Sequence, residues 1–164
     1  MRTTALLLTV AAAVPLQRQV ITFHGIGPVR IGASLADASL AAGEQLADAK
    51  DKPSGSEGCY HVRLQSSPTL LFMVESDRIT RIETRDSRFR TQSGARVGDS
   101  EAEARRIYGK RLEVMEHKYY EDGHYLIVRS ADDQYAVVME TDGKKVVQIN
   151  AGLWPSVGYV EGCL

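Results

Sequence analysis

The chain has 164 residues, of which 43% are hydrophobic and 25% are charged, and its formal net charge at pH 7 is -1. This length and apolar fraction allow a buried core in one domain or in two small fused units, and they exclude an intrinsically disordered chain. The near-neutral charge argues against nucleic-acid binding, because nucleic-acid binders usually carry a clear basic excess.

The first residues predict a secretory signal peptide that covers about residues 1–19. Arg2 supplies a positively charged start, residues 5–14 form an apolar run, and Ala11-x-Ala13 is a small-residue cleavage pattern. A buried N-terminal helix is the alternative. The apolar run is shorter than the ~20 residues that span a bilayer as a helix. We therefore expect a periplasmic or secreted protein with no integral membrane span.

The chain contains two cysteines, Cys59 and Cys163. In an exported protein an even number of cysteines favours a disulfide. This bridge would close a loop of about 100 residues, which the chain-entropy model associates with about 4–5 kcal/mol of stabilisation. Two buried free thiols and a reactive redox pair are the alternatives, although the Cys-x-x-Cys spacing of redox pairs is absent.

An internal duplication organises the chain. The stretch from Arg30 to Gly43 recurs without gaps from Arg96 to Gly109. In each copy a serine, Ser34 or Ser100, is followed three residues later by an acidic residue, which is the capping-box pattern of a helix start. The final glycine of each copy is typical of a helix end. The sequence therefore predicts two short helices, 35–42 and 101–108, which must pack on a sheet to be stable.

Runs with strand character surround these helices. Residues 60–64 alternate apolar and polar side chains, which places Arg63 on the polar face of a half-buried strand. Asp-Gly pairs at 122–123 and 142–143 predict tight turns in the second half. The expected strands are 20–23, 29–31, 60–64, 70–75 and 78–84, then 112–119, 125–129, 135–140 and 145–150.

Together these elements predict an α+β fold of two tandem repeats, each a short helix packed on an antiparallel three- or four-stranded meander. Residues 20–86 would form the first repeat, and residues 87–164 the second repeat with the C-terminal tail. The tail would return to the first repeat and be held there by a Cys59–Cys163 disulfide.

This arrangement, with a Gly-x-Ser-x-x-acid helix start in each half of an exported chain, resembles the fold of the β-lactamase inhibitor protein. It also resembles the small lipoprotein subunit of the outer-membrane barrel-assembly machine, which has one such unit. The resemblance covers about residues 28–150 and implies a protein that binds other proteins through an exposed sheet face and hairpin loops. It places no contact residue on this sequence.

The sequence shows no clear catalytic constellation. Its histidines lack the His-x-x-x-His spacing of a zinc site, and the acidic pair Asp132-Asp133 lacks the ligand series of a calcium loop. His117 and His124 flank the turn at 122–123, so a metal between them is an alternative to two exposed histidines. We expect no enzyme activity, no cofactor and no metal, and a hydrolase with a histidine and acid site is an alternative.

Five arginines lie between positions 78 and 90, and they fit either a patch for an acidic partner or a solvated linker with local ion pairs. Tyrosine, tryptophan and arginine commonly anchor protein interfaces. We therefore predict a non-catalytic exported module, inhibitor-like or envelope-associated, that binds another envelope or secreted protein. A periplasmic small-ligand binder is the alternative. The predicted binding residues are Arg63, Arg81, Tyr119, Tyr120, Arg129 and Trp154.

Overall fold

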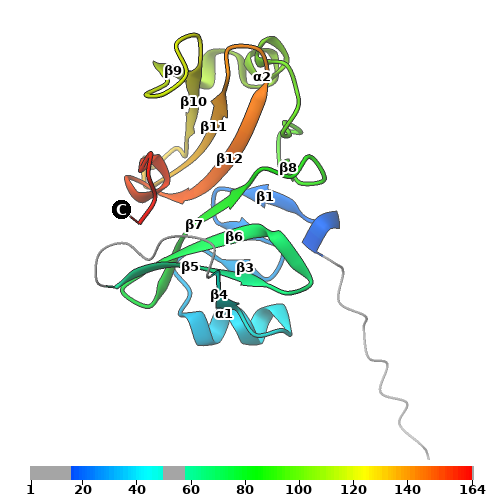
Figure 1. Cartoon of the computed structure of the whole chain (residues 1–164), viewed down its shortest axis with the longest axis vertical. Helices are drawn as coiled ribbons and strands as arrows, with labels where there is room; N and C mark the ends of the chain where they lie inside the picture. The colour runs from blue at the N-terminus through cyan, green and yellow to red at the C-terminus, as the bar shows by residue number, and fades with distance from the viewer. Residues whose placement is uncertain (1–15, 50–57, 164) are drawn as a thin grey trace, which may run out of the picture.

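A computed structural model describes residues 16–49 and 58–163, so most of the predicted signal peptide lies outside the described residues (Figure 1). The described strands are β1 Val20–Thr22, β2 Gly25–Ile26, β3 Val29–Arg30, β4 Ala47–Asp48, β5 Cys59–Leu64, β6 Ser67–Glu75, β7 Arg78–Thr84, β8 Arg90–Thr91, β9 Leu112–Glu116, β10 His124–Arg129, β11 Tyr135–Thr141 and β12 Val146–Leu153. The α-helices are α1 Leu35–Ala42 and α2 Glu101–Tyr108, and short 3-10 helices cover Leu16–Arg18, Gly109–Arg111 and Ser156–Gly158.

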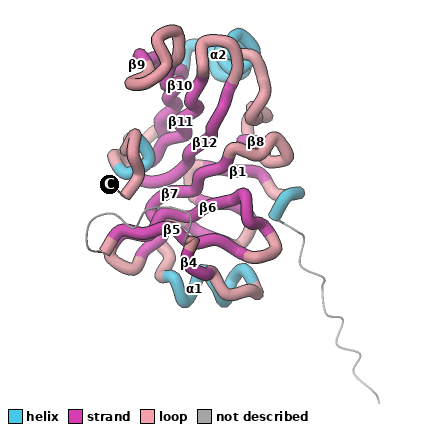
Figure 2. Tube along the Cα trace, viewed as in Figure 1, coloured by secondary structure: helices cyan, strands magenta, loops and turns pink. Residues whose placement is uncertain are grey.

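The strands form two sheets. The larger sheet has eight strands in the order β4-β5-β6-β7-β12-β11-β10-β9, and the smaller has four in the order β3-β2-β1-β8. Strands dominate the fold, and the two α-helices lie at opposite ends of the molecule (Figure 2).

The predicted α+β fold of two separate helix-and-meander repeats is wrong, because the protein is a β-rich fold. β7 and β12 pair antiparallel, with Thr84 opposite Ile149 and Arg81 opposite Gly152, so strands from both predicted repeats belong to one sheet. The small sheet also joins distant segments, since β1 pairs with β8 in parallel. A separate meander would leave backbone donors and acceptors of β7 and β12 unpaired at two edges, and pairing these strands removes both edges.

The predicted helix starts are confirmed. The Ser34 hydroxyl accepts from the Asp37 N–H, and the Ser100 hydroxyl accepts from the Glu103 N–H, each at 3.1 Å. The returning half of the predicted capping box is absent in the second helix, because the Glu103 carboxylate instead pairs with Arg106 at 2.6 Å. Hydroxyl capping is therefore the interaction that begins both helices.

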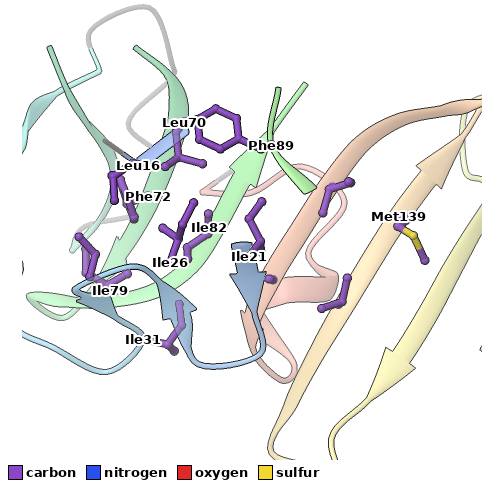
Figure 3. Close-up of a cluster of buried hydrophobic side chains, with 14 of the residues drawn as sticks. Leu16, Ile21, Ile26, Ile31, Leu70, Phe72, Ile79, Ile82, Phe89 and Met139 are labelled. Carbon is purple, nitrogen blue, oxygen red and sulfur yellow. The ribbon is translucent and has the colours of Figure 1, made fainter. Parts of the chain in front are cut away.

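One face of the large sheet, the inner face, packs on the small sheet to form the main core. Figure 3 shows Ile21 and Ile26 of the small sheet close to Phe72 and Ile82 of the large sheet, and each of these side chains is at most 1% exposed. Leu16 also contributes to this core. Core burial of this kind holds the two sheets together as one unit.

The opposite face of the large sheet, here called the outer face, carries most of the polar strand residues. The cross-strand register aligns His61, Met73 and Arg81 in one row that ends at Arg129. The next row includes Arg63. The three arginines that were predicted to bind a partner thus share the outer face.

Removing the second helix cap tests the local part of this fold. Ser100→Ala should lower the free energy of unfolding by about 1 kcal/mol, because the Glu103 N–H loses its acceptor. Urea denaturation measures the change, and Ser87→Ala, at an exposed serine outside any helix, serves as the control. Equal stability of the two variants would contradict a cap at Ser100.

Crowding the junction between β7 and β12 tests the merged sheet. A Cβ at Gly152 would overlap the Thr80 carbonyl oxygen, so Gly152→Ala should destabilise the fold by about 1–3 kcal/mol beyond its backbone strain. Gly94→Ala is the matched control, because Gly94 also has a positive φ of 103° but nothing within 4 Å. Thermal unfolding of both variants provides the comparison, and a smaller loss for Gly152→Ala than for Gly94→Ala would argue against this junction.

Candidate functional site

The C-terminal tail crosses the outer face after β12 ends. Val157 is 1% exposed and packs on Ile127, Ala136 and Val138 of the outer face. The tail ends at Cys163, which forms the predicted disulfide with Cys59 at a Cα–Cα distance of 5.4 Å. The disulfide prediction is therefore confirmed. A disulfide is consistent with an exported protein, because cytosolic thiols are normally kept reduced.

Arg81 lies beneath this tail. One terminal nitrogen of its guanidinium donates to the Tyr159 carbonyl oxygen at 2.7 Å, and the other pairs with the Glu83 carboxylate. His61 Nε2 is 3.7 Å from Glu83 Oε2. Since Arg81 is only 3% exposed, it holds the tail in place and offers a partner no accessible charge.

The other predicted residues of the outer face lie in two places. The Arg129 guanidinium carbon is 3.7 Å from the centre of the half-buried Trp154 ring, a cation-π contact beside the tail. Arg63 is half-buried on β5, on the other side of the sheet order from β10, and donates to the Pro68 carbonyl oxygen at 3.5 Å. The structure therefore brings Arg129 and Trp154 together and keeps Arg63 apart from them.

The run of arginines between positions 78 and 90 has local partners. Arg78 donates to the Gly32 carbonyl oxygen at 2.8 Å, and Arg88 pairs with Asp86 at 2.5 Å. Because Arg81 also lies inside the fold, these arginines make separate structural contacts. This favours local pairs over a single cationic patch.

Exposed apolar side chains are concentrated in two segments, one at and after the edge strand β9 and one in the tail. Among the described residues, six of the seven exposed large hydrophobic side chains come from β9, the loop after it, and the tail. We call this set the apolar rim. Its members are Val114, Met115, Tyr119, Tyr120, Tyr159 and Val160.

The two segments of the apolar rim are tied to each other through Glu161. Lys118 Nζ is 2.8 Å from a Glu161 carboxylate oxygen, and the Tyr119 hydroxyl donates to the same oxygen. These hydrogen bonds lower the pKa of Glu161, and the hydrogen bond that Lys118 donates to Glu161 raises the pKa of Lys118. Both shifts favour the charged form, so this ion pair connects the loop to the tail.

His117 shapes the turn that presents the two tyrosines. Its Nδ1 accepts from the backbone N–H of Tyr119 at 3.0 Å and of Tyr120 at 3.2 Å. Because a backbone N–H can only donate, Nδ1 carries no proton and Nε2 carries it. The imidazole stacks on the Tyr125 ring at a centroid distance of 4.4 Å. In the sequence, only the position of His117 just before the tyrosines hints at this role.

The two histidines around the turn at 122–123 do not meet. His117 Nε2 is 3.6 Å from Glu140 Oε2 on the outer face, whereas His124 Nδ1 is 3.0 Å from Glu101 Oε2 at the start of α2. Within residues 16–49 and 58–163 there is no group of three or more histidine, cysteine, aspartate or glutamate side chains suited to a metal ion. The same ranges contain no helix with the length and apolar character of a membrane span.

Comparisons with known proteins show what the fold is similar to. The chain is similar to the uncharacterized protein YfeY from Escherichia coli, with 12% sequence identity and a TM-score of 0.54 over 81% of this chain and 99% of that one. It is also similar to an extracellular protein containing an SCP domain from Bacillus anthracis, with 6% identity and a TM-score of 0.50 over 98% of this chain. The match covers 52% of that second protein.

At these identities the two likenesses show the fold alone. No family model matches the chain, and no curated protein matches it. The resemblance to the β-lactamase inhibitor protein and to the assembly lipoprotein is therefore not confirmed, whereas the likeness to these two proteins shows a small β-rich fold.

Replacing both cysteines tests how strongly the disulfide stabilises the fold. The bridge spans 104 residues, so the double variant Cys59→Ser with Cys163→Ser should unfold at lower temperature, with a loss of about 2–5 kcal/mol. A reducing agent should lower the melting temperature of the natural protein and leave that of the double variant unchanged. Two titratable thiols in the unfolded, unreduced natural protein would contradict the bridge.

Proposed function

We propose that the protein is a non-catalytic exported module that binds another envelope or secreted protein through the apolar rim. The observation that carries this proposal is the concentration of exposed apolar side chains in segments 114–120 and 159–160. Such side chains are usually scattered singly on a monomer, and a concentration of them is typical of an interaction site.

The residue types of the apolar rim support a protein partner. Tyr119 and Tyr120 are 60% and 47% exposed, and tyrosine is among the residues that most often anchor interfaces. The His117 hydrogen bonds hold the turn of these tyrosines before any partner arrives. Preorganisation of this kind reduces the entropy lost on association.

The polar groups of the apolar rim support a binding role over a catalytic one. Lys118 and Glu161 form an ion pair with each other, and His117 Nδ1 is occupied by two backbone N–H groups. Their hydrogen-bonding capacity is used to shape the surface, so the rim offers contacts to a partner and no activated group to a substrate.

Paired affinity captures test this function. The purified, oxidised protein would be incubated with the envelope and culture-supernatant fractions of its source cells, beside the double variant Tyr119→Ala with Tyr120→Ala. We expect one protein to be retained in stoichiometric amount by the natural chain and lost with the variant. Once that protein is purified, the variant should bind it at least about tenfold more weakly, because it lacks two anchor rings.

Leu40→Ala is the matched control. Leu40 is 82% exposed on α1, so this variant removes an exposed apolar side chain outside the apolar rim. It should retain the partner as the natural chain does. Equal losses for both variants, or no protein that distinguishes the natural chain from the tyrosine variant, would contradict a docking role for the apolar rim.

A further inference from the structure

A hollow lies on the outer face, away from the apolar rim. It has a volume of about 510 Å³, within the size range of small-molecule sites. It shares no residue with the apolar rim or the tail. Its walls come from β6, β7, β12 and the segment after β7, with the lining residues Thr69, Leu71, Glu83, Thr84, Arg85, Asp86, Ser87 and Gln148.

Among the charged residues that line this hollow, Arg85 remains available to a ligand. Glu83 is paired with Arg81, and the Asp86 carboxylate binds the Arg88 guanidinium. The hydrogen bonds from Arg88 hold the pKa of Asp86 well below its usual range, so Asp86 is ionised and its charge is balanced. Arg85 is exposed and makes no ion pair with the carboxylates of the described chain. Arg85 is therefore the one cation among the lining residues, and it is open to an anionic ligand.

A chain of hydrogen bonds through buried side chains positions the Arg85 guanidinium. Arg85 Nε donates to Gln148 Oε1 at 2.7 Å, and Gln148 Nε2 donates to Asn150 Oδ1 at 2.9 Å. Asn150 Nδ2 and Gln148 Nε2 both donate to Glu140 Oε1. Gln148 is 6% exposed and Asn150 is 2% exposed. Their shared bonds fix the Arg85 side chain at Nε and leave its terminal nitrogens to a ligand.

We propose that this hollow binds a small monocarboxylic acid with an apolar chain. The terminal nitrogens of Arg85 match the two oxygens of a carboxylate, and the Ser87 hydroxyl is a further donor in the same wall. The apolar chain lies against Leu71, which is half-buried in the floor. The ligand carries one negative charge, because Glu83 and Asp86 repel a second. This site does not depend on the proposed docking at the apolar rim.

Titration with octanoate tests the proposal on the oxidised protein. Amide chemical shifts in proton-nitrogen NMR spectra should move in saturable fashion at Leu71, Arg85 and Ser87, and those of Tyr119 and Tyr120 should not. Octan-1-ol has the same chain without the charge, and octylammonium has the opposite charge. Both should bind at least about tenfold more weakly than octanoate, because each lacks the charge-assisted bonds to Arg85.

Variants at Arg85 test whether its guanidinium binds the carboxylate of octanoate. Arg85→Gln should weaken octanoate binding at least about tenfold. The octanoate affinity of Arg85→Lys should lie between those of the natural chain and of Arg85→Gln, because lysine keeps the charge but lacks the two-pronged geometry. Arg90→Gln removes an exposed arginine outside the hollow and should bind as the natural chain does. The melting temperature of each variant confirms that it is folded.

Three results would overturn this site. They are equal affinities for octanoate and octan-1-ol, unchanged octanoate affinity in Arg85→Gln, and shift changes that map to other parts of the protein. Absence of saturable binding at millimolar octanoate also counts against it.

Discussion

The pairing of β7 with β12 is the constraint on which the rest of the structure depends. Gly152 makes this pairing possible, because its missing Cβ lets β12 approach the Thr80 carbonyl oxygen of β7. The pairing joins two groups of strands into one eight-stranded sheet with two faces. One face then has a single apolar surface to bury against the small sheet, and the other is left for polar residues.

The tail buries part of the outer face. Val157 covers an apolar area of β10 and β11, while Arg81 and Glu83 form an ion pair beneath Tyr159. A buried ion pair costs desolvation energy that its own attraction offsets only in good geometry. The disulfide at Cys163 holds the tail over this pair, so a covalent bond helps to keep the buried ion pair covered.

Glu140 connects the supports of the two proposed surfaces. Its Oε1 accepts from Gln148 and Asn150, which position Arg85, and its Oε2 lies 3.6 Å from His117 Nε2, which shapes the tyrosine turn. The half-buried Glu140 carboxylate thus lies next to residues that support both the hollow and the apolar rim. The hydrogen bonds to its Oε1 hold the strand residues behind Arg85. The tyrosine turn lies in the loop after β9, where His117 Nδ1 holds it.

The local elements follow from the amino-acid sequence alone. Ser34 and Ser100 predicted both helix starts, residues 78–84 were recognised as a strand, and two cysteines in an exported chain predicted their disulfide. These features depend on neighbours a few residues away or on a single possible pairing. Tertiary structure alone decided that β7 meets β12, that Arg81 lies inside and holds the tail, and that Arg85 faces a hollow. Strand order and burial depend on contacts between residues far apart in the chain, and side-chain alternation within one strand carries no information about which strand or tail will cover it.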